Sequence, residues 1–182
     1  MTTEVVVRVM RPDEWPMARD VGIDAFDGDG LPELLDALRA SWSWIDELAF
    51  VAAVDGAIAG MVLFNRAILD TDDRNVDVLL LSPLGVRRDL QHRGIGSALM
   101  RGALDVLAAT RPEPAVFLEG IPTYYPRFGF RRARPLGFTP PSHRIPDEAF
   151  MVYTLPSYTP DLRGGVVYPD AFWRVDGVGL RG

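Results

Sequence analysis

Two glycines separated by one residue, Gly94 and Gly96, stand where a polar loop meets an apolar segment with helical periodicity. The stretch 84–99 reads Leu-Gly-Val-Arg-Arg-Asp-Leu-Gln-His-Arg-Gly-Ile-Gly-Ser-Ala-Leu, a pattern typical of a strand, a short loop and a helix. The first N–H groups of a helix have no partner inside the helix, and glycines allow an anion to approach them closely. The stretch therefore predicts a phosphate-binding site.

Positive charge surrounds this loop although the chain as a whole is acidic. The sequence has 19 basic and 25 acidic residues, a net charge of −6, which disfavours a general nucleic-acid or anionic-membrane binder. Between Arg87 and Arg134 there are nine arginines and four acids. Arg87, Arg88, His92 and Arg93 lie beside the two glycines, so we expect this region to bind an anion.

Several kinds of site are excluded by what the sequence lacks. A dinucleotide-binding fingerprint needs Gly or Ala where Leu99 stands, and a P-loop needs a lysine, which the chain does not contain. The Gly-x-Ser-x-Gly motif of serine hydrolases does not occur. The chain has no cysteine, and His92 and His143 lack the spacing of metal ligands, so neither a cysteine nucleophile nor a metal site is expected.

The loop needs a strand and a helix to hold it, and the sequence predicts both within one globular domain. Of the 182 residues, 48 % are hydrophobic and 24 % are charged, as in ordinary globular proteins. Apolar runs, with an Asp-Gly hairpin turn at 55–56, predict strands over 4–10, 49–54, 57–66, 76–86, 115–119 and 150–155. Helical periodicity predicts helices over 12–26, 31–38 and 94–109, and Pro83 is expected to mark a bulge or an edge. These elements indicate the α/β (α+β) class.

The chain ends in a segment without clear periodicity. Residues 156–182 are rich in Pro, Gly and Tyr and are expected to form an irregular extension packed on the domain of residues 1–155. A turn is expected at 27–30. Residues 1–10 do not fit a signal-peptide core, and the longest uncharged stretch, 149–160, is too short to span a membrane. We therefore expect a soluble, cytoplasmic protein.

The loop and its surroundings resemble the GNAT N-acetyltransferase superfamily. The pyrophosphate loop of that family reads Gln/Arg-x-x-Gly-x-Gly/Ala, which Gln91, Gly94 and Gly96 match. The run Tyr-Tyr-Pro-Arg-Phe-Gly-Phe at 124–130 resembles its Tyr-x-x-x-Gly-Phe signature. Together with Tyr-Pro-Asp-Ala-Phe at 168–172, this run is similar to a bacterial branch often called YhbS-like acetyltransferases.

The resemblance implies a GNAT acyl-CoA N-acyltransferase fold, with a mixed, mostly antiparallel sheet that is splayed between its fourth and fifth strands and flanked by helices. It implies acetyl-CoA as cosubstrate, with the pantetheine arm paired to the backbone of 84–86 and the pyrophosphate held by N–H groups of 92–97. Arg87, Arg88 or Arg93 would reach the phosphate on the adenosine side. The cofactor-binding residues implied are Leu84, Gly85, Val86, Gln91, His92, Arg93, Gly94, Ile95, Gly96, Ser97 and Tyr125.

The implied reaction is direct attack of an amine on the thioester in a ternary complex. It needs a neutral amine, a polarised carbonyl and a proton for the leaving thiolate. The Val86 N–H would polarise the carbonyl. Tyr125, four residues before Gly129, matches the general acid of the family better than Tyr124 does.

The general base departs from the best-known pattern of the family. Histone-type members have a Glu four residues before the position of Val86, where this chain has Ser82. Asp77, Glu119 or a chain of water molecules would have to accept the proton of the amine instead. We prefer Glu119, because in this fold its strand would end beside the acyl group.

Two other classes of function stay open beside the enzyme. The missing Glu allows a non-catalytic module that senses acyl-CoA, and a structural or interaction protein would keep only the fold. The acceptor of the enzyme would be an amine of a small molecule or a polypeptide, and the acidic remainder of the surface favours a polyamine, an aminoglycoside or a lysine-bearing peptide. Trp42 and Trp44 are candidate contacts for that acceptor. Dimers are common in proteins of this resemblance, so a homodimer is a further expectation.

Overall fold

The computed structural model describes residues 4–26 and 30–178, in which nine strands form one mixed, mostly antiparallel sheet. The strand order is β1-β2-β3-β4-β5-β8-β6, and β9 pairs with both β3 and β7. The strands are β1 (Val5–Val9), β2 (Ala49–Val54), β3 (Ala57–Asp70), β4 (Asn75–Val86), β5 (Ala115–Glu119), β6 (Arg131–Arg132), β7 (Phe138–Thr139), β8 (Phe150–Thr154) and β9 (Gly164–Val167). The helices are α1 (Trp15–Asp24), α2 (Leu31–Arg39), α3 (Ile95–Thr110) and α4 (Asp170–Arg174), with short 3-10 turns between elements.

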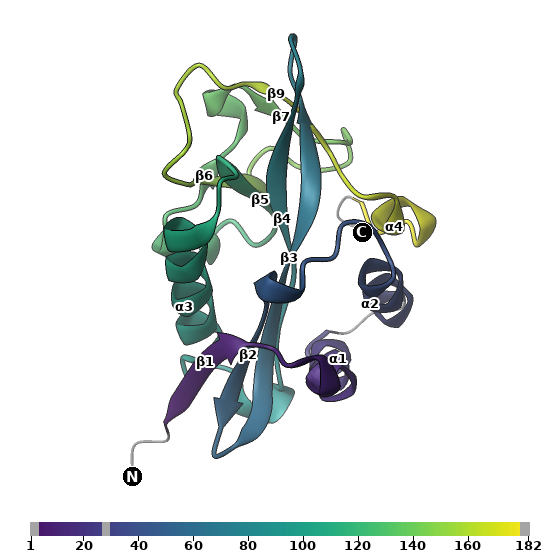
Figure 1. Ribbon diagram of the computed structural model, residues 1–182, viewed down its shortest axis with the longest axis vertical. Coiled ribbons are helices and arrows are strands. Elements are labelled where there is room, and N and C mark those ends of the chain that lie inside the picture. The colour runs from purple at the N-terminus through teal and green to yellow at the C-terminus, as the bar shows by residue number, and fades with distance from the viewer. Residues whose placement is uncertain (1–3, 27–29, 179–182) are drawn as a thin grey trace.

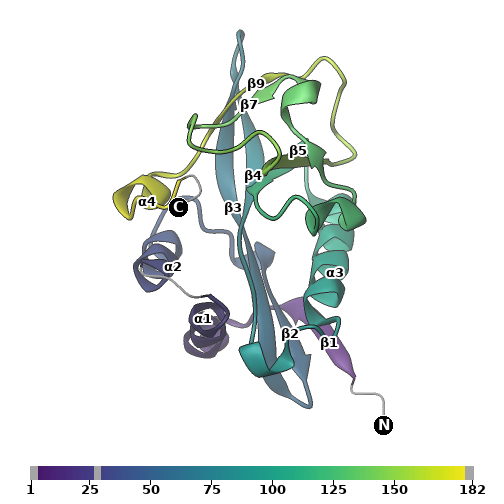
Figure 2. The same cartoon turned by 180° about the vertical axis from the view of Figure 1, so that it is seen from behind.

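Helices cover both faces of the sheet. α1, α2 and α4 lie on one face and α3 lies on the other, as opposite views of the molecule show (Figure 1 and Figure 2). Because successive side chains of a strand point to opposite faces, Phe64 of β3 packs with Leu99 and Ala103 of α3, whereas Leu63 packs with Ala18 of α1. The long strands β3 and β4 are therefore buried on both faces.

The bulge predicted at Pro83 of β4 is confirmed. The pairing of β4 with β3 slips at this point, so that Ser82 and Pro83 together oppose the single residue Leu63. The predicted β2–β3 hairpin is also present, with positive φ angles at both turn residues, Asp55 (50°) and Gly56 (82°).

β4 and β5 separate after a short parallel contact. They pair through only two residues each, Leu79 with Val116 and Leu80 with Phe117. β5 continues along β8 instead, as far as Glu119. In the described part of the chain, the edge of β4 beyond Leu80 therefore has no strand partner on this side. The expected splay of the sheet is confirmed, and it opens a space between the two strands.

The C-terminal segment contains regular elements where the sequence predicts an irregular extension. β9 pairs with residues Ile68–Asp70 of β3 and with β7, and α4 follows it close to α2 (Figure 1). A Gly-Gly-Val-Val strand is stabilised by hydrogen bonds to strands far away in the sequence, and local periodicity does not reveal such pairing. Residues 27–29 of the predicted turn and residues 179–182 of the predicted extension lie outside the described residues.

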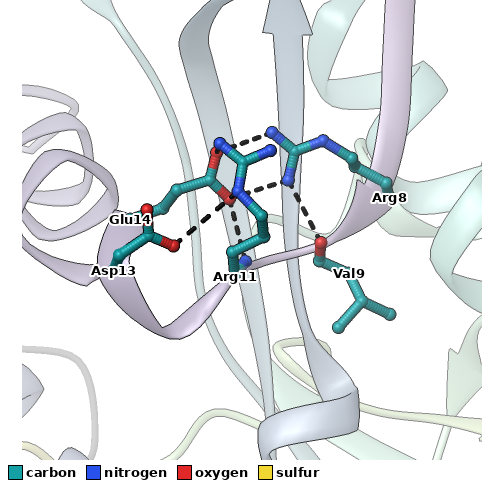
Figure 3. Close-up of polar contacts among 5 residues, drawn as sticks. All are labelled: Arg8, Val9, Arg11, Asp13 and Glu14. Carbon is teal, nitrogen blue, oxygen red and sulfur yellow. Dashed lines mark hydrogen bonds and ion pairs between the residues drawn. The ribbon is translucent and has the colours of Figure 1, made fainter.

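One buried acid joins β1 to the start of α1 (Figure 3). The Glu14 side chain, only 3 % exposed, accepts hydrogen bonds from the Arg8 guanidinium at 2.7 and 2.6 Å and from the Arg11 backbone N–H at 2.8 Å. The Arg11 guanidinium adds an ion pair at 2.7 Å. The hydrogen bonds from Arg8 lower the pKa of Glu14 to about 2. This network fixes the direction in which the chain enters α1.

Candidate active site

A cavity of about 830 Å³ lies in the space where β4 and β5 separate. Its walls come from the end of β4, the loop before α3, the first turn of α3 and the segment that follows β5. The cavity brings together predicted residues from all of these elements, namely Leu84, Val86, Gln91, His92, Gly94, Ile95, Gly96, Ser97, Glu119 and Tyr125.

Two residues predicted to bind the cofactor do not line this cavity. Gly85 faces α1 instead, and a Cβ atom at this position would lie 3.0 Å from the Cβ atom of Ala25. Gly85 therefore allows α1 to pack closely against β4. Arg93 is exposed on the loop before α3.

The N-terminus of α3 opens into the cavity without a side-chain cap. Its N-cap residue Gly94 has a left-handed conformation (φ 83°), and no side chain makes a capping hydrogen bond there. The free N–H groups and the positive end of the helix dipole favour a bound anion. Gln91 holds the loop in place, because its Nε2 donates a hydrogen bond to the carbonyl oxygen of Val86 at 3.0 Å.

The backbone of Val86 is directed toward the cavity. The N–H of the next residue, Arg87, donates to the Ala59 carbonyl of β3 at 2.9 Å. Successive residues of a strand direct their backbone polar groups to opposite edges, so the N–H and C=O of Val86 point away from β3. The hydrogen bond from Gln91 to the Val86 carbonyl agrees with this orientation.

The arginines expected to reach a phosphate make other contacts. Arg87 donates two hydrogen bonds to Asp89, at 2.7 and 2.6 Å, and the Nε of Arg88 donates to the backbone carbonyl oxygen of Asp24 at 2.5 Å. Neither arginine lines the cavity. Arg127, which the sequence analysis did not select, does line it.

Two adjacent tyrosines form the wall that faces the loop. The rings of Tyr124 and Tyr125 meet edge to face, with centroids 5.1 Å apart, and the Arg127 guanidinium stacks over Tyr124 at 4.8 Å. The Tyr125 ring packs so closely on Gly120 that a Cβ atom there would overlap it. Burial, with a smaller contribution from Tyr124, raises the pKa of Tyr125 to about 12. At neutral pH the Tyr125 hydroxyl therefore carries its proton and can donate it.

Only one of the two acids considered as general base borders the cavity. Glu119 lines it at the end of β5, as does Ser82, whereas Asp77 is exposed on β4 and is not part of the lining. Burial and then the charge of Glu119 raise the pKa of Tyr168, a buried residue of the C-terminal segment. The C-terminal segment thus packs close to Glu119.

The cavity also has an apolar wall that the sequence analysis missed. Phe26 follows α1, Leu31 begins α2 and Ile121 follows β5, and all three line the cavity. Phe26 is 44 % and Ile121 64 % exposed. Each stands at the end of an element, where no periodic pattern separates a residue that lines a cavity from an ordinary surface residue.

The two tryptophans considered as acceptor contacts lie outside this cavity. Trp44 packs edge to face on Trp15, with centroids 5.2 Å apart, and donates a hydrogen bond to Asp46 at 2.8 Å. Trp42 lines a separate cavity of about 240 Å³ near α4.

Within residues 4–26 and 30–178, no helix is long and apolar enough to cross a membrane, and no cluster of three His, Asp or Glu side chains is placed to hold a metal ion.

Comparison with known proteins identifies relatives of this chain. Residues 46–132, which include the loop before α3, Glu119 and Tyr125, match the family model of the acetyltransferase (GNAT) domain. YjhQ of Escherichia coli (strain K12), an uncharacterized N-acetyltransferase, is 29 % identical over 141 residues, which are 78 % of this chain and 77 % of the relative. The resemblance inferred from the sequence motifs is thereby confirmed.

Two solved structures extend the comparison beyond the matched domain. The GNAT family N-acetyltransferase YhbS of Escherichia coli, in complex with CoA, has a TM-score of 0.85 at 26 % identity and covers 100 % of this chain and 97 % of its own. A GNAT family acetyltransferase of Brucella melitensis, in complex with acetyl-CoA, has a TM-score of 0.72 at 25 % identity and covers 93 % of this chain and 99 % of its own. The GNAT fold is thus confirmed, and the likeness to YhbS includes the C-terminal segment.

Proposed function

The chain carries a GNAT acetyltransferase domain, and from this premise we propose that it transfers the acetyl group of acetyl-CoA to a primary amine of a small molecule or a polypeptide. One observation carries the proposal. The cavity between β4 and β5 joins an uncapped helix N-terminus, which suits a phosphate, to a protonated tyrosine and a carboxylate, which suit proton transfer. Acetyl transfer needs both parts in one site.

Acetyl-CoA would bind along the open edge of β4. The backbone of Leu84–Val86 would pair with the amides of the pantetheine arm as an added strand, because this edge has no strand partner among the described residues. The N–H groups at the start of α3 would hold the pyrophosphate, with Gly94 and Gly96 keeping side chains away from it. Arg127 replaces Arg87 and Arg88 as our candidate for a further phosphate contact, because it borders the cavity.

The acetyl group would move in one direct step within a ternary complex. The amine nitrogen attacks the thioester carbonyl, so a C–N bond forms and the C–S bond breaks. The inward N–H of Val86 would stabilise the negative charge that develops on the carbonyl oxygen. Tyr125 would give its proton to the leaving thiolate, and Glu119 would take the proton that the amine loses.

Tyr125 is supported as the acid by its position, since it lines the cavity on the wall that faces the loop before α3. A phenol with a pKa of about 12 stays protonated throughout the neutral range and is therefore available as a donor. Glu119 is supported as the base by its position, since it is the only carboxylate among the described residues that line the cavity. A cytoplasmic location and a homodimer stay predictions.

Titration calorimetry with acetyl-CoA and CoA tests the site, and Gly96→Glu is the control variant. Its carboxylate would lie at the start of α3 and repel the pyrophosphate. We expect the wild type to bind both ligands and Gly96→Glu to bind neither. A thiol-release assay with amines then measures transfer without background, because the chain has no cysteine. Binding without turnover of any amine would favour a non-catalytic sensor of acyl-CoA, and no binding would overturn the proposed site.

A further inference from the structure

We infer that the acceptor is a primary amine carried on an apolar or aromatic body, which packs between Phe26 and Ile121 while its nitrogen faces Glu119. The inference rests on the proposed acetyl transfer and names the substrate class of the same cavity. It replaces the polyamine, aminoglycoside or lysine-bearing peptide that the acidic net charge suggested.

The first observation is the exposure of large apolar side chains inside a cavity. Phe26 is 44 % and Ile121 64 % exposed, and both border the cavity together with Leu31. Apolar side chains that are gathered in a cavity and stay open to solvent mark a binding surface for an apolar ligand.

The second observation is the place of these residues in the fold. Phe26 comes shortly after α1 and Leu31 is the first residue of α2, and both helices lie on the face of the sheet opposite α3 (Figure 1 and Figure 2). The phosphates of the cosubstrate are assigned to the N-terminus of α3. The cavity therefore reaches through the splay of the sheet, and its α1–α2 end is left for the second substrate.

The third observation is the charge of the lining. Glu119 is its only carboxylate among the described residues. A polyamine or an aminoglycoside carries several ammonium groups, each of which needs an anionic or strongly polar partner when it leaves water. One carboxylate beside apolar side chains suits one ammonium group on an apolar body.

Ile121 lies close in the sequence to the carboxylate that would face the amine. It stands two residues after Glu119 on the segment that follows β5, so the charged and the apolar contact come from one short stretch of chain. An amine separated from its apolar body by one or two methylene groups could reach both. 2-Phenylethylamine has this form, and ethanolamine keeps the amine without the apolar body.

The test compares four amines with acetyl-CoA in the thiol-release assay: 2-phenylethylamine, hexylamine, ethanolamine and spermidine. We expect kcat/KM for 2-phenylethylamine and hexylamine to exceed that for ethanolamine by about tenfold or more, since apolar contacts of this size distinguish substrates by such factors. Phe26→Ala and Ile121→Ala should each reduce this preference by about fivefold and leave the acetyl-CoA Kd unchanged. Met17→Ala, which removes another exposed apolar side chain of α1 outside the cavity, should leave the preference intact.

Three results would overturn the inference. Spermidine or ethanolamine as the best acceptor would show that the apolar wall does not bind the acceptor. No turnover of any of the four amines would overturn the apolar acceptor class, and no turnover of any other amine either would favour the non-catalytic sensor of acyl-CoA. If Phe26→Ala and Ile121→Ala changed the Kd of octanoyl-CoA but not the preference among the amines, the apolar wall would bind long acyl chains and not the acceptor. In each case, measured binding of acetyl-CoA would show that the cofactor site is intact. A protein that does not bind acetyl-CoA would overturn the proposed function as well.

Discussion

A Cβ atom on Gly96 would lie 3.0 Å from the hydroxyl oxygen of Tyr124. The first turn of α3 and the tyrosine segment after β5 therefore approach each other across the cavity, and the approach depends on the missing side chain. Gly96 has no positive φ angle, so backbone conformation does not demand a glycine here. Glycine fits this position because the space between α3 and the Tyr124 hydroxyl leaves little room for a side chain.

Gly96→Ala should weaken CoA binding while the protein stays folded. The added methyl group makes the end of the Tyr124 side chain move and narrows the site at the helix N-terminus, which we expect to raise the Kd of CoA by about tenfold, or about 1.4 kcal/mol. Replacing Gly by Ala inside a helix favours the helix itself, so the Tm should not fall. Calorimetry and thermal unfolding measure the two effects.

A second substitution shows whether Tyr124 is the cause. Tyr124→Phe removes the oxygen atom that the new methyl group would meet, so the double variant should recover at least part of the CoA affinity that Gly96→Ala loses. An equal loss in the single and the double variant would mean that the methyl group obstructs the ligand directly.

Tyr125→Phe should abolish most of the turnover and leave acetyl-CoA binding intact. Loss of a general acid reduces rates by about 100-fold to 10,000-fold. Tyr124→Phe is the matched control, because it removes a hydroxyl from the neighbouring ring and should keep most of kcat. If Tyr125→Phe kept the kcat of the wild type, another group would have to protonate the thiolate.

The pH dependence of kcat gives an independent test of Tyr125. Burial raises the pKa of Tyr125 to about 12, so its acidic form persists well above the range in which an ordinary tyrosine loses its proton. We therefore expect no loss of kcat from tyrosine ionisation between about pH 8 and about pH 10. A basic limb with an apparent pKa near 10 that disappears in Tyr125→Phe would contradict this assignment.

The phosphate loop could be predicted from the sequence because its signals are local. A strand, a polar loop and two glycines before a helical pattern are contiguous, and the structure gives Gly94 the left-handed conformation of an N-cap glycine. Pro83 likewise marked the bulge of its strand because a proline cannot donate a ladder hydrogen bond.

The rest of the site depends on packing between distant segments. Phe26 enters the cavity from the segment after α1, and Ile121 enters it from the segment after β5, and their neighbours in the sequence show no pattern that distinguishes them. Arg127 lies within the tyrosine motif at 124–130, but the motif does not reveal that this side chain borders the cavity. The conformation of β9 likewise depends on its pairing with β3 and β7. Arg87 and Arg88 looked suited to a phosphate from their position beside the loop, but the Arg87 guanidinium is bound by Asp89 and the Arg88 Nε donates to the backbone carbonyl of Asp24.

Asn65→Ala should destabilise the bulge of β4 and weaken acetyl-CoA binding together. Asn65 is fully buried, and its Nδ2 donates a hydrogen bond to the Ser82 carbonyl at 2.9 Å. Leaving that half-buried carbonyl without a donor costs about 1–3 kcal/mol, which corresponds to a fall in Tm of about 2–12 °C for a chain of this size. Asn75→Ala, at an exposed asparagine that begins β4, is the control and should change neither Tm nor Kd. A stable Asn65→Ala protein with normal Kd would show that the bulge does not need this hydrogen bond.

Glu14→Gln should destabilise the protein at neutral pH but much less in acid. The pKa of Glu14 falls from its ordinary value of 4.5 to about 2 because Arg8 donates hydrogen bonds to the carboxylate. A shift of this size corresponds to about 3 kcal/mol, and the exposure of Arg11 to solvent reduces our expectation to about 2 kcal/mol. A lowered carboxyl pKa stabilises the fold above the pKa of the unfolded chain, and this stabilisation is lost as the pH falls toward the pKa of the folded state.

The free energy of unfolding of wild type and Glu14→Gln should therefore differ by a constant amount above about pH 6 and converge as the pH falls from about 4.5 toward 2. Urea unfolding across this range measures the difference. Asp13→Asn is the matched control, because the Asp13 side chain is 78 % exposed and reaches Arg11 only at 3.7 Å, so its loss should cost little at any pH. A difference for Glu14→Gln that stays the same down to pH 3 would mean that the shape of the carboxyl group, and not its charge, holds β1 to α1.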